Sequence, residues 1–150
     1  MRFLFYDRIL EMEPGKHARA EKLVTLADEY FPEHYPRRPV MPGTLIMESL
    51  SQLAGWLNIV SWEFKADTVM VLVEGVRIHR QVRPGDLMTL ETWMLYTHPD
   101  GSTIRGEVRS DKEIIAAVDR VVFANRKVTD EREIQRKREV FRYYSGDFPL

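Results

Sequence analysis

The segment from Thr44 to Phe64 most strongly limits how this chain can fold. Its apolar residues recur so often that they would surround an α-helix on nearly all faces. They are Leu45, Ile46, Met47, Leu50, Leu53, Ala54, Trp56, Leu57, Ile59 and Val60. A helix that is apolar all round is stable only when other parts of the protein enclose it. The segment therefore predicts one long, buried helix.

The chain after Asp67 changes to the pattern of β-strands. Runs rich in β-branched and aromatic residues alternate with short turns, such as the one at residues 83–86. The runs cover residues 69–82, 87–97, 102–109 and 113–125, and an earlier strand is expected near residues 20–26. Short turns join antiparallel neighbours. We therefore expect an α+β domain in which a curved antiparallel sheet packs against the long helix.

Composition excludes several classes of protein. The 150 residues are 44% hydrophobic and 30% charged with a formal net charge of -1, so no overall attraction to nucleic acid is expected. The chain has no cysteine, which excludes disulfides, thiolate catalysis and cysteine-ligated zinc. No stretch reaches the apolar length of a membrane span, and Asp7 and Arg8 come too early for a signal peptide. A cytoplasmic location is expected.

The last segment, residues 129–150, differs from the rest. Asp130 to Glu133 has the composition of a helix start, and Arg136-Lys137-Arg138 is a dense basic triplet. We expect a first domain over residues 1–128 and a C-terminal extension made of a short, mostly exposed helix and an aromatic tail. The aromatic residues of this tail are Phe141, Tyr143, Tyr144 and Phe148.

A proline-rich loop leads into the buried helix and carries the clearest chemical pattern. Prolines stiffen the loop around His34, and a histidine can act as a general base near neutral pH. Glu48 lies one turn inside the helix, where burial disfavours the charged form and makes it a candidate proton donor. Gln52 follows four residues later on the same helical face and can orient the carboxyl group.

The helix entrance offers a third component at Pro42-Gly43-Thr44. The first backbone N–H groups of a helix have no partner inside the helix, and Gly43 lets a ligand oxygen approach closely. Such donors suit a carbonyl oxygen that gains negative charge during a reaction. Taken singly, each component has a simpler alternative: a solvated loop histidine, a structural buried carboxylate and an ordinary helix start.

Together, the spacing of these components resembles the β-hydroxyacyl-acyl carrier protein dehydratases, the FabA/FabZ type of hotdog-fold enzyme, and is closer to the FabZ type. That family pattern runs Gly-His-Phe-Pro, Pro-x-x-Pro-Gly, Leu-x-x-Glu (or Asp) and Ala-x-Gln. This chain has His34-Tyr35-Pro36, Pro39-Val40-Met41-Pro42-Gly43, Leu45-Ile46-Met47-Glu48 and Ser51-Gln52. Residues 2–10 and 76–86 also resemble the family, so the resemblance covers roughly residues 1–125.

The resemblance implies a hotdog fold and a role for each component. His34 would remove the α-proton of a 3-hydroxyacyl thioester, and Glu48 would help the β-hydroxyl group leave as water. Gly43, beside Thr44, would polarise the thioester carbonyl, and Gln52 would support the site. No metal or organic cofactor is implied, since the acyl chain arrives on the phosphopantetheine of acyl carrier protein. A homodimer that shares residues between subunits is implied, with a trimer of dimers as the alternative.

Charged residues around His34 depart from the family pattern. Glu33 stands where the family has glycine, and Arg37 with Arg38 follows where a small residue is usual. The arginines either face the acidic carrier protein or its phosphate, or are solvated loop charges.

Two other functions fit the same fold. A hotdog thioesterase uses a helix carboxylate to handle water, and a non-catalytic hotdog protein only binds acyl groups. The His34 loop and the Pro42-Gly43 entrance favour dehydration.

Overall fold

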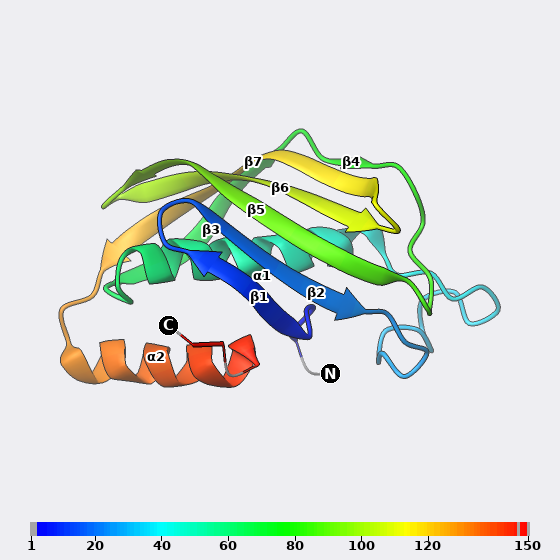
Figure 1. Cartoon of the computed structure of the whole chain (residues 1–150), viewed down its shortest axis with the longest axis horizontal. Coiled ribbons are helices and arrows are strands. Elements are labelled where there is room, and N and C mark those ends of the chain that lie inside the picture. Colours follow the sequence, from blue (N-terminus) through cyan, green and yellow to red (C-terminus); the bar gives the residue numbers. More distant parts are fainter. Residues whose placement is uncertain (1–2, 147, 150) are drawn as a thin grey trace.

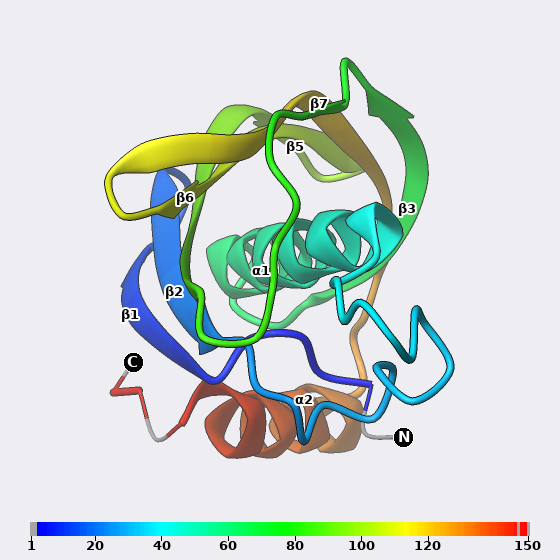
Figure 2. The same cartoon turned by 90° about the vertical axis from the view of Figure 1, so that its right-hand side faces the viewer.

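A single long helix, α1 (Gly43–Ser61), runs through the middle of the structure, as its sequence predicts. The computed structural model describes residues 3–146 and 148–149. Among these residues, a curved sheet wraps around α1, and a second helix, α2 (Glu131–Ser145), lies outside the sheet (Figures 1 and 2). α1 ends before Phe64 because Glu63 and Phe64 take positive φ angles and Phe64 N–H turns back to the Ile59 carbonyl, 2.9 Å away.

The sheet is antiparallel throughout, and its described strands follow the order β1-β2-β5-β6-β7-β3, with β4 beside β7. The strands are β1 (Arg8–Glu13), β2 (His17–Leu23), β3 (Ala66–Glu74), β4 (Arg77–Ile78), β5 (Leu87–His98), β6 (Gly101–Ser110) and β7 (Glu113–Lys127). Alternate residues of β6 are buried against the helix. Gly106 of β6 lets Leu50 of α1 approach, since a Cβ there would lie 3.1 Å from a Leu50 methyl carbon. The expected α+β class is confirmed.

The expected strand over residues 69–82 is divided in the structure. Gly75 has a φ of 68° and ends β3, and the short β4 then resumes pairing with the same strand, β7, in the register that Glu74 and Arg120 set. Space as well as φ requires glycine here, because a Cβ at Gly75 would lie 2.1 Å from a carboxylate oxygen of Asp119. The strand expected near residues 20–26 is β2, which starts and ends earlier.

α2 is longer and better packed than the short exposed helix expected for the C-terminal extension. The Asp130 side chain caps its start by accepting the Arg132 N–H at 2.9 Å, and Gly146 ends it in the left-handed conformation. Phe141, Tyr143 and Tyr144 belong to the helix, not to an aromatic tail. Ile134 and Phe141 are buried on one face of α2 and stabilise its packing. The few apolar residues in the sequence of this helix did not predict that burial.

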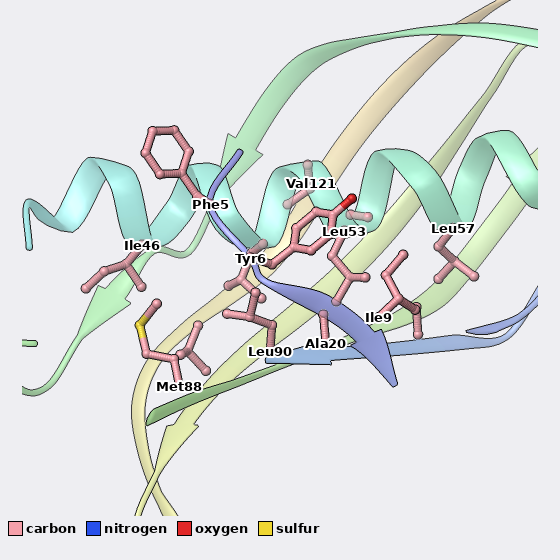
Figure 3. Packing of buried hydrophobic residues seen from close by; sticks show 14 of the residues in the cluster. Phe5, Tyr6, Ile9, Ala20, Ile46, Leu53, Leu57, Met88, Leu90 and Val121 are labelled. Atoms are coloured by element: carbon pink, nitrogen blue, oxygen red, sulfur yellow. The ribbon is translucent and has the colours of Figure 1, made fainter. Parts of the chain in front are cut away.

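The N-terminal segment completes the enclosure of α1. Phe5, Tyr6 and Ile9 are buried and lie alongside the helix, near Leu53 and Leu57 (Figure 3). No helix in the described part of the chain is long and apolar enough to cross a membrane.

The burial of Phe141 gives a test of how α2 is held. Its ring lies 5.2 Å from the Trp56 ring of α1 and 5.8 Å from the Phe64 ring, centroid to centroid. We expect Phe141→Ala to lower the free energy of unfolding by about 3–5 kcal/mol in urea titrations, because it leaves a cavity under α1. Tyr143→Ala, on the same helix but 69% exposed, should cost less than about 1 kcal/mol. Equal losses for the two variants would contradict this packing.

Candidate active site

His34 stands on the long loop between β2 and α1. Its backbone N–H donates to the Tyr30 carbonyl at 3.0 Å, and its side chain is exposed. The next residue, Tyr35, has a φ of 63°, an uncommon conformation for a residue other than glycine. The Arg38 N–H then closes a further turn onto the Tyr35 carbonyl at 2.8 Å. Two consecutive turns therefore set the direction of the loop at the histidine.

Glu48 and Gln52 form a hydrogen-bonded pair on α1. Gln52 Nε2 donates to Glu48 Oε1 at 3.0 Å, and the Glu48 side chain is half-buried. The amide of Gln52 is itself fixed by the N-terminal segment, since its Oε1 accepts the Phe5 N–H at 3.0 Å and its Nε2 donates to the Phe3 carbonyl at 3.3 Å. The structure thus places Gln52 where it orients the carboxylate of Glu48.

The entrance of α1 is formed by backbone alone. Pro42 is the N-cap residue, and no side chain caps the helix there. Ile78 of β4 lies over Gly43, because a Cβ at Gly43 would be 2.4 Å from the Ile78 Cδ1 atom. Thr44 follows with an exposed side chain. A side chain at position 43 would therefore have to displace Ile78 from the helix start.

A cavity of about 420 Å³ lies between the loop and this helix entrance. Its lining residues are Tyr35, Arg38, Val40, Met41, Pro42, Gly43, Ile46, Ile78, Arg80 and Gln81. Arg38 donates to Gln81 Oε1 at 3.2 Å, and Arg80 pairs with Asp86 at 3.1 Å. The cavity thus combines an apolar floor with two guanidinium groups at a helix start that Ile78 partly covers, a combination that suits an acyl group with a polar end.

The predicted site residues divide into two groups in one chain. Gly43 lines the cavity together with the loop residues Tyr35 and Arg38. His34 and Thr44 lie beside these residues in the chain but do not line the cavity, and Glu48 and Gln52 do not line it either, since Gln52 bonds to the N-terminal segment and to Glu48. Sequence reasoning missed Ile78, Arg80 and Gln81, which reach the cavity only because the chain after β3 turns back over the start of α1. The resemblance of residues 76–86 to the family was the available signal.

Among the described residues, no group of three or more histidine, aspartate or glutamate side chains is placed to hold a metal ion.

The amino-acid sequence is similar to one protein-family model and to several known proteins. A family model described as a FabA-like domain matches residues 1–119. The 3-hydroxyacyl-[acyl-carrier-protein] dehydratase FabZ of Aromatoleum aromaticum is 35% identical over 126 residues, which cover 77% of this chain and 87% of that protein. The FabZ of Caldicellulosiruptor saccharolyticus is 37% identical over 123 residues, covering 77% and 88%. The FabZ of a Roseiflexus species is 44% identical over 90 residues, covering 59% of this chain and under two thirds, 63%, of that protein.

Solved structures with a similar course of the chain come from several proteins. The dehydratase heterocomplex ApeI:P from Xenorhabdus doucetiae has a TM-score of 0.65 at 14% identity, over 90% of this chain and 89% of that one. A hypothetical thioesterase with coenzyme A from Streptococcus pneumoniae has a TM-score of 0.66 at 10% identity, over 82% and 88%. At 10–14% identity the likeness shows the fold alone, and the dehydratase and the hypothetical thioesterase both have that fold.

The hydrogen bonds of Gln52 give a test of the Glu48–Gln52 pair on α1. We expect Gln52→Leu to lower the free energy of unfolding by about 1–3 kcal/mol, because the Phe5 N–H and the Glu48 carboxylate both lose a partner. Gln135→Leu makes the same change on the exposed face of α2 and should stay within about 0.5 kcal/mol of the unaltered protein. A Gln52→Leu protein as stable as the control would show that these hydrogen bonds contribute nothing.

Proposed function

We infer that this chain, which belongs to the FabA-like family, is a 3-hydroxyacyl-[acyl-carrier-protein] dehydratase of the FabZ type. Such a hydro-lyase removes water from a 3-hydroxyacyl thioester and leaves a trans-2-enoyl thioester, a step of fatty acid or related lipid and polyketide synthesis. The observation that carries this conclusion is the match to FabZ proteins over 77% of the chain, together with the hotdog fold. The family and fold expected from the sequence pattern are confirmed.

The reaction needs a base, an acid and a donor to the carbonyl. His34 takes the α-proton of the substrate, and the electron pair left behind forms the new double bond as the C–O bond at the β-carbon breaks. Glu48, in its acid form, gives its proton to the departing hydroxyl group, which leaves as water. The Gly43 N–H donates to the thioester oxygen, which stabilises the negative charge that develops there. Gln52 holds the Glu48 carboxyl group through the 3.0 Å hydrogen bond, and Thr44 lies beside the carbonyl site.

Glu48 does not line the cavity that Gly43 lines, and this supports a site shared between two subunits. β3 lies at the edge of the sheet and exposes a run of apolar residues, among them Val69 at 65% and Val71 at 58%. Exposed apolar edge strands are rare in monomers because they pair readily with another strand. We therefore assign β3 to the contact with a second copy of this chain, which brings His34 of one subunit to Glu48 of the other. A trimer of such dimers is the alternative assembly.

The partner that delivers the substrate is acyl carrier protein. Arg37 and Arg38 are exposed on the loop beside the cavity, where they suit an acidic protein surface or the phosphate of its phosphopantetheine arm.

The reaction transfers only protons and water, so no metal or organic cofactor takes part. The lack of cysteine suits a reducing compartment, and we assign the enzyme to the cytoplasm.

Two alternatives share the fold. A thioesterase would use Glu48 to direct water at the thioester carbonyl, and the hypothetical thioesterase from Streptococcus pneumoniae has the same course of the chain. A non-catalytic acyl-binding protein would need neither His34 nor Glu48. The loop histidine next to the cavity and the helix entrance favour dehydration over both.

One assay separates the three functions. The purified protein is mixed with crotonyl-acyl carrier protein, with its 3-hydroxyacyl form and with a saturated acyl form. We expect reversible interconversion of the first two, followed by the absorbance of the enoyl thioester, without release of free thiol. Thiol release from the saturated substrate would identify a thioesterase, and binding without turnover of any substrate would identify an acyl-binding protein.

A further inference from the structure

A buried lysine lies at the end of β2, where the loop that carries His34 begins. Lys22 is 5% exposed, and its Nζ atom lies 3.2 Å from Asp28 Oδ1 and 3.9 Å from Asp7 Oδ1. Lysine is almost never fully buried unless it is paired, because an isolated buried charge is costly. The two carboxylates supply that pairing, so Lys22 ties the loop residue Asp28 to the sheet.

The Asp28 carboxylate collects donors from three directions. Besides Lys22, its Oδ2 atom accepts the Thr25 N–H at 3.1 Å and the Tyr30 hydroxyl at 2.9 Å. Burial, and then the hydrogen bond to Asp28, raise the pKa of the Tyr30 hydroxyl well above its usual value. Tyr30 therefore remains a hydrogen-bond donor to Asp28 over the whole pH range in which the protein would be used.

Tyr30 connects this cluster to the catalytic histidine. Its carbonyl accepts the His34 N–H at 3.0 Å, and the Asp28 carbonyl accepts the Phe31 N–H at 3.2 Å. The Tyr30 ring is buried and lies 4.5 Å from the Phe31 ring and 6.4 Å from the Phe5 ring, centroid to centroid. The backbone of His34 is thus one hydrogen bond away from a residue held on three sides.

The loop needs such support. It runs from residue 24 to residue 42 without a described helix or strand, and loops of this length open easily unless their own residues hold them. A base works only when it is held within hydrogen-bond reach of the proton that it removes. We propose that Lys22, Asp28 and Tyr30 form a loop anchor, a cluster that holds His34 in place for proton abstraction. The proposal rests on the proposed function, and because the cluster acts on His34 through the Tyr30 carbonyl, its three members are positioning residues.

The test compares two changes in the loop anchor with one elsewhere. Tyr30→Phe removes the hydroxyl group and keeps the ring, and Lys22→Met removes the buried charge. The matched control is Lys137→Met, because the Lys137 side chain is 17% exposed and also pairs with two carboxylates, Asp67 and Glu133. In the dehydratase assay, at a temperature where all variants remain folded, kcat should fall roughly tenfold to a hundredfold for the two anchor variants, with KM within about twofold of the unaltered enzyme. Lys137→Met should retain kcat.

A second readout does not depend on turnover. Hydrogen exchange followed by mass spectrometry should show faster exchange for backbone amides of residues 28–38 in Tyr30→Phe and Lys22→Met, and no change there in Lys137→Met. Unchanged exchange in both anchor variants would overturn the proposal, and so would faster exchange with an unaltered kcat. If the unaltered protein has no dehydratase activity, the proposed function fails, and the exchange pattern alone decides whether the loop anchor exists.

Discussion

The enclosure of α1 determines the rest of this structure. A helix with apolar residues on nearly every face leaves no side that water can cover, so the sheet curls over it and the N-terminal segment and α2 close the remainder (Figure 2). Leu50, Leu53 and Leu57 have no exposed surface, and losing the side chain of a leucine in such a place costs about 2–5 kcal/mol. The requirement to bury this helix fixes where its first residues, and with them Gly43 and Glu48, can lie.

Polar groups on such a helix need partners, and the partners create the site. Gln52 is accommodated because the backbone of Phe3 and Phe5 satisfies its amide, and the same amide then holds Glu48. The ring of Phe5 in turn lies beside Tyr30, whose carbonyl holds the backbone of His34. One short N-terminal segment therefore contacts both the helix that carries Glu48 and the loop that carries His34.

Local patterns predicted most of the fold. Apolar periodicity located α1, and short turns located β5, β6 and β7, because these features depend on neighbours in the sequence. The break at Gly75 and the burial of Phe141 were not predictable, since each depends on a residue distant in sequence, Asp119 and Trp56 respectively. The motif from His34 to Gln52 suggested the chemistry through its resemblance to a family, whereas the approach of Ile78 and Arg80 to Gly43 arises only once the chain has folded back. The proposed meeting of His34 with Glu48 of a second copy is likewise beyond any local pattern.

The central claim is a dehydration site with its base and acid on different subunits. Complementation between two inactive variants tests this claim most directly. His34→Ala and Glu48→Gln should each abolish turnover while leaving the dimer intact. When the two differently tagged variants are unfolded together and refolded, half of the dimers are mixed and each mixed dimer has one intact site, so about a quarter of the original activity should return. A mixture that forms mixed dimers but remains inactive would contradict a shared site, and near-normal activity of either variant alone would contradict the roles of His34 and Glu48.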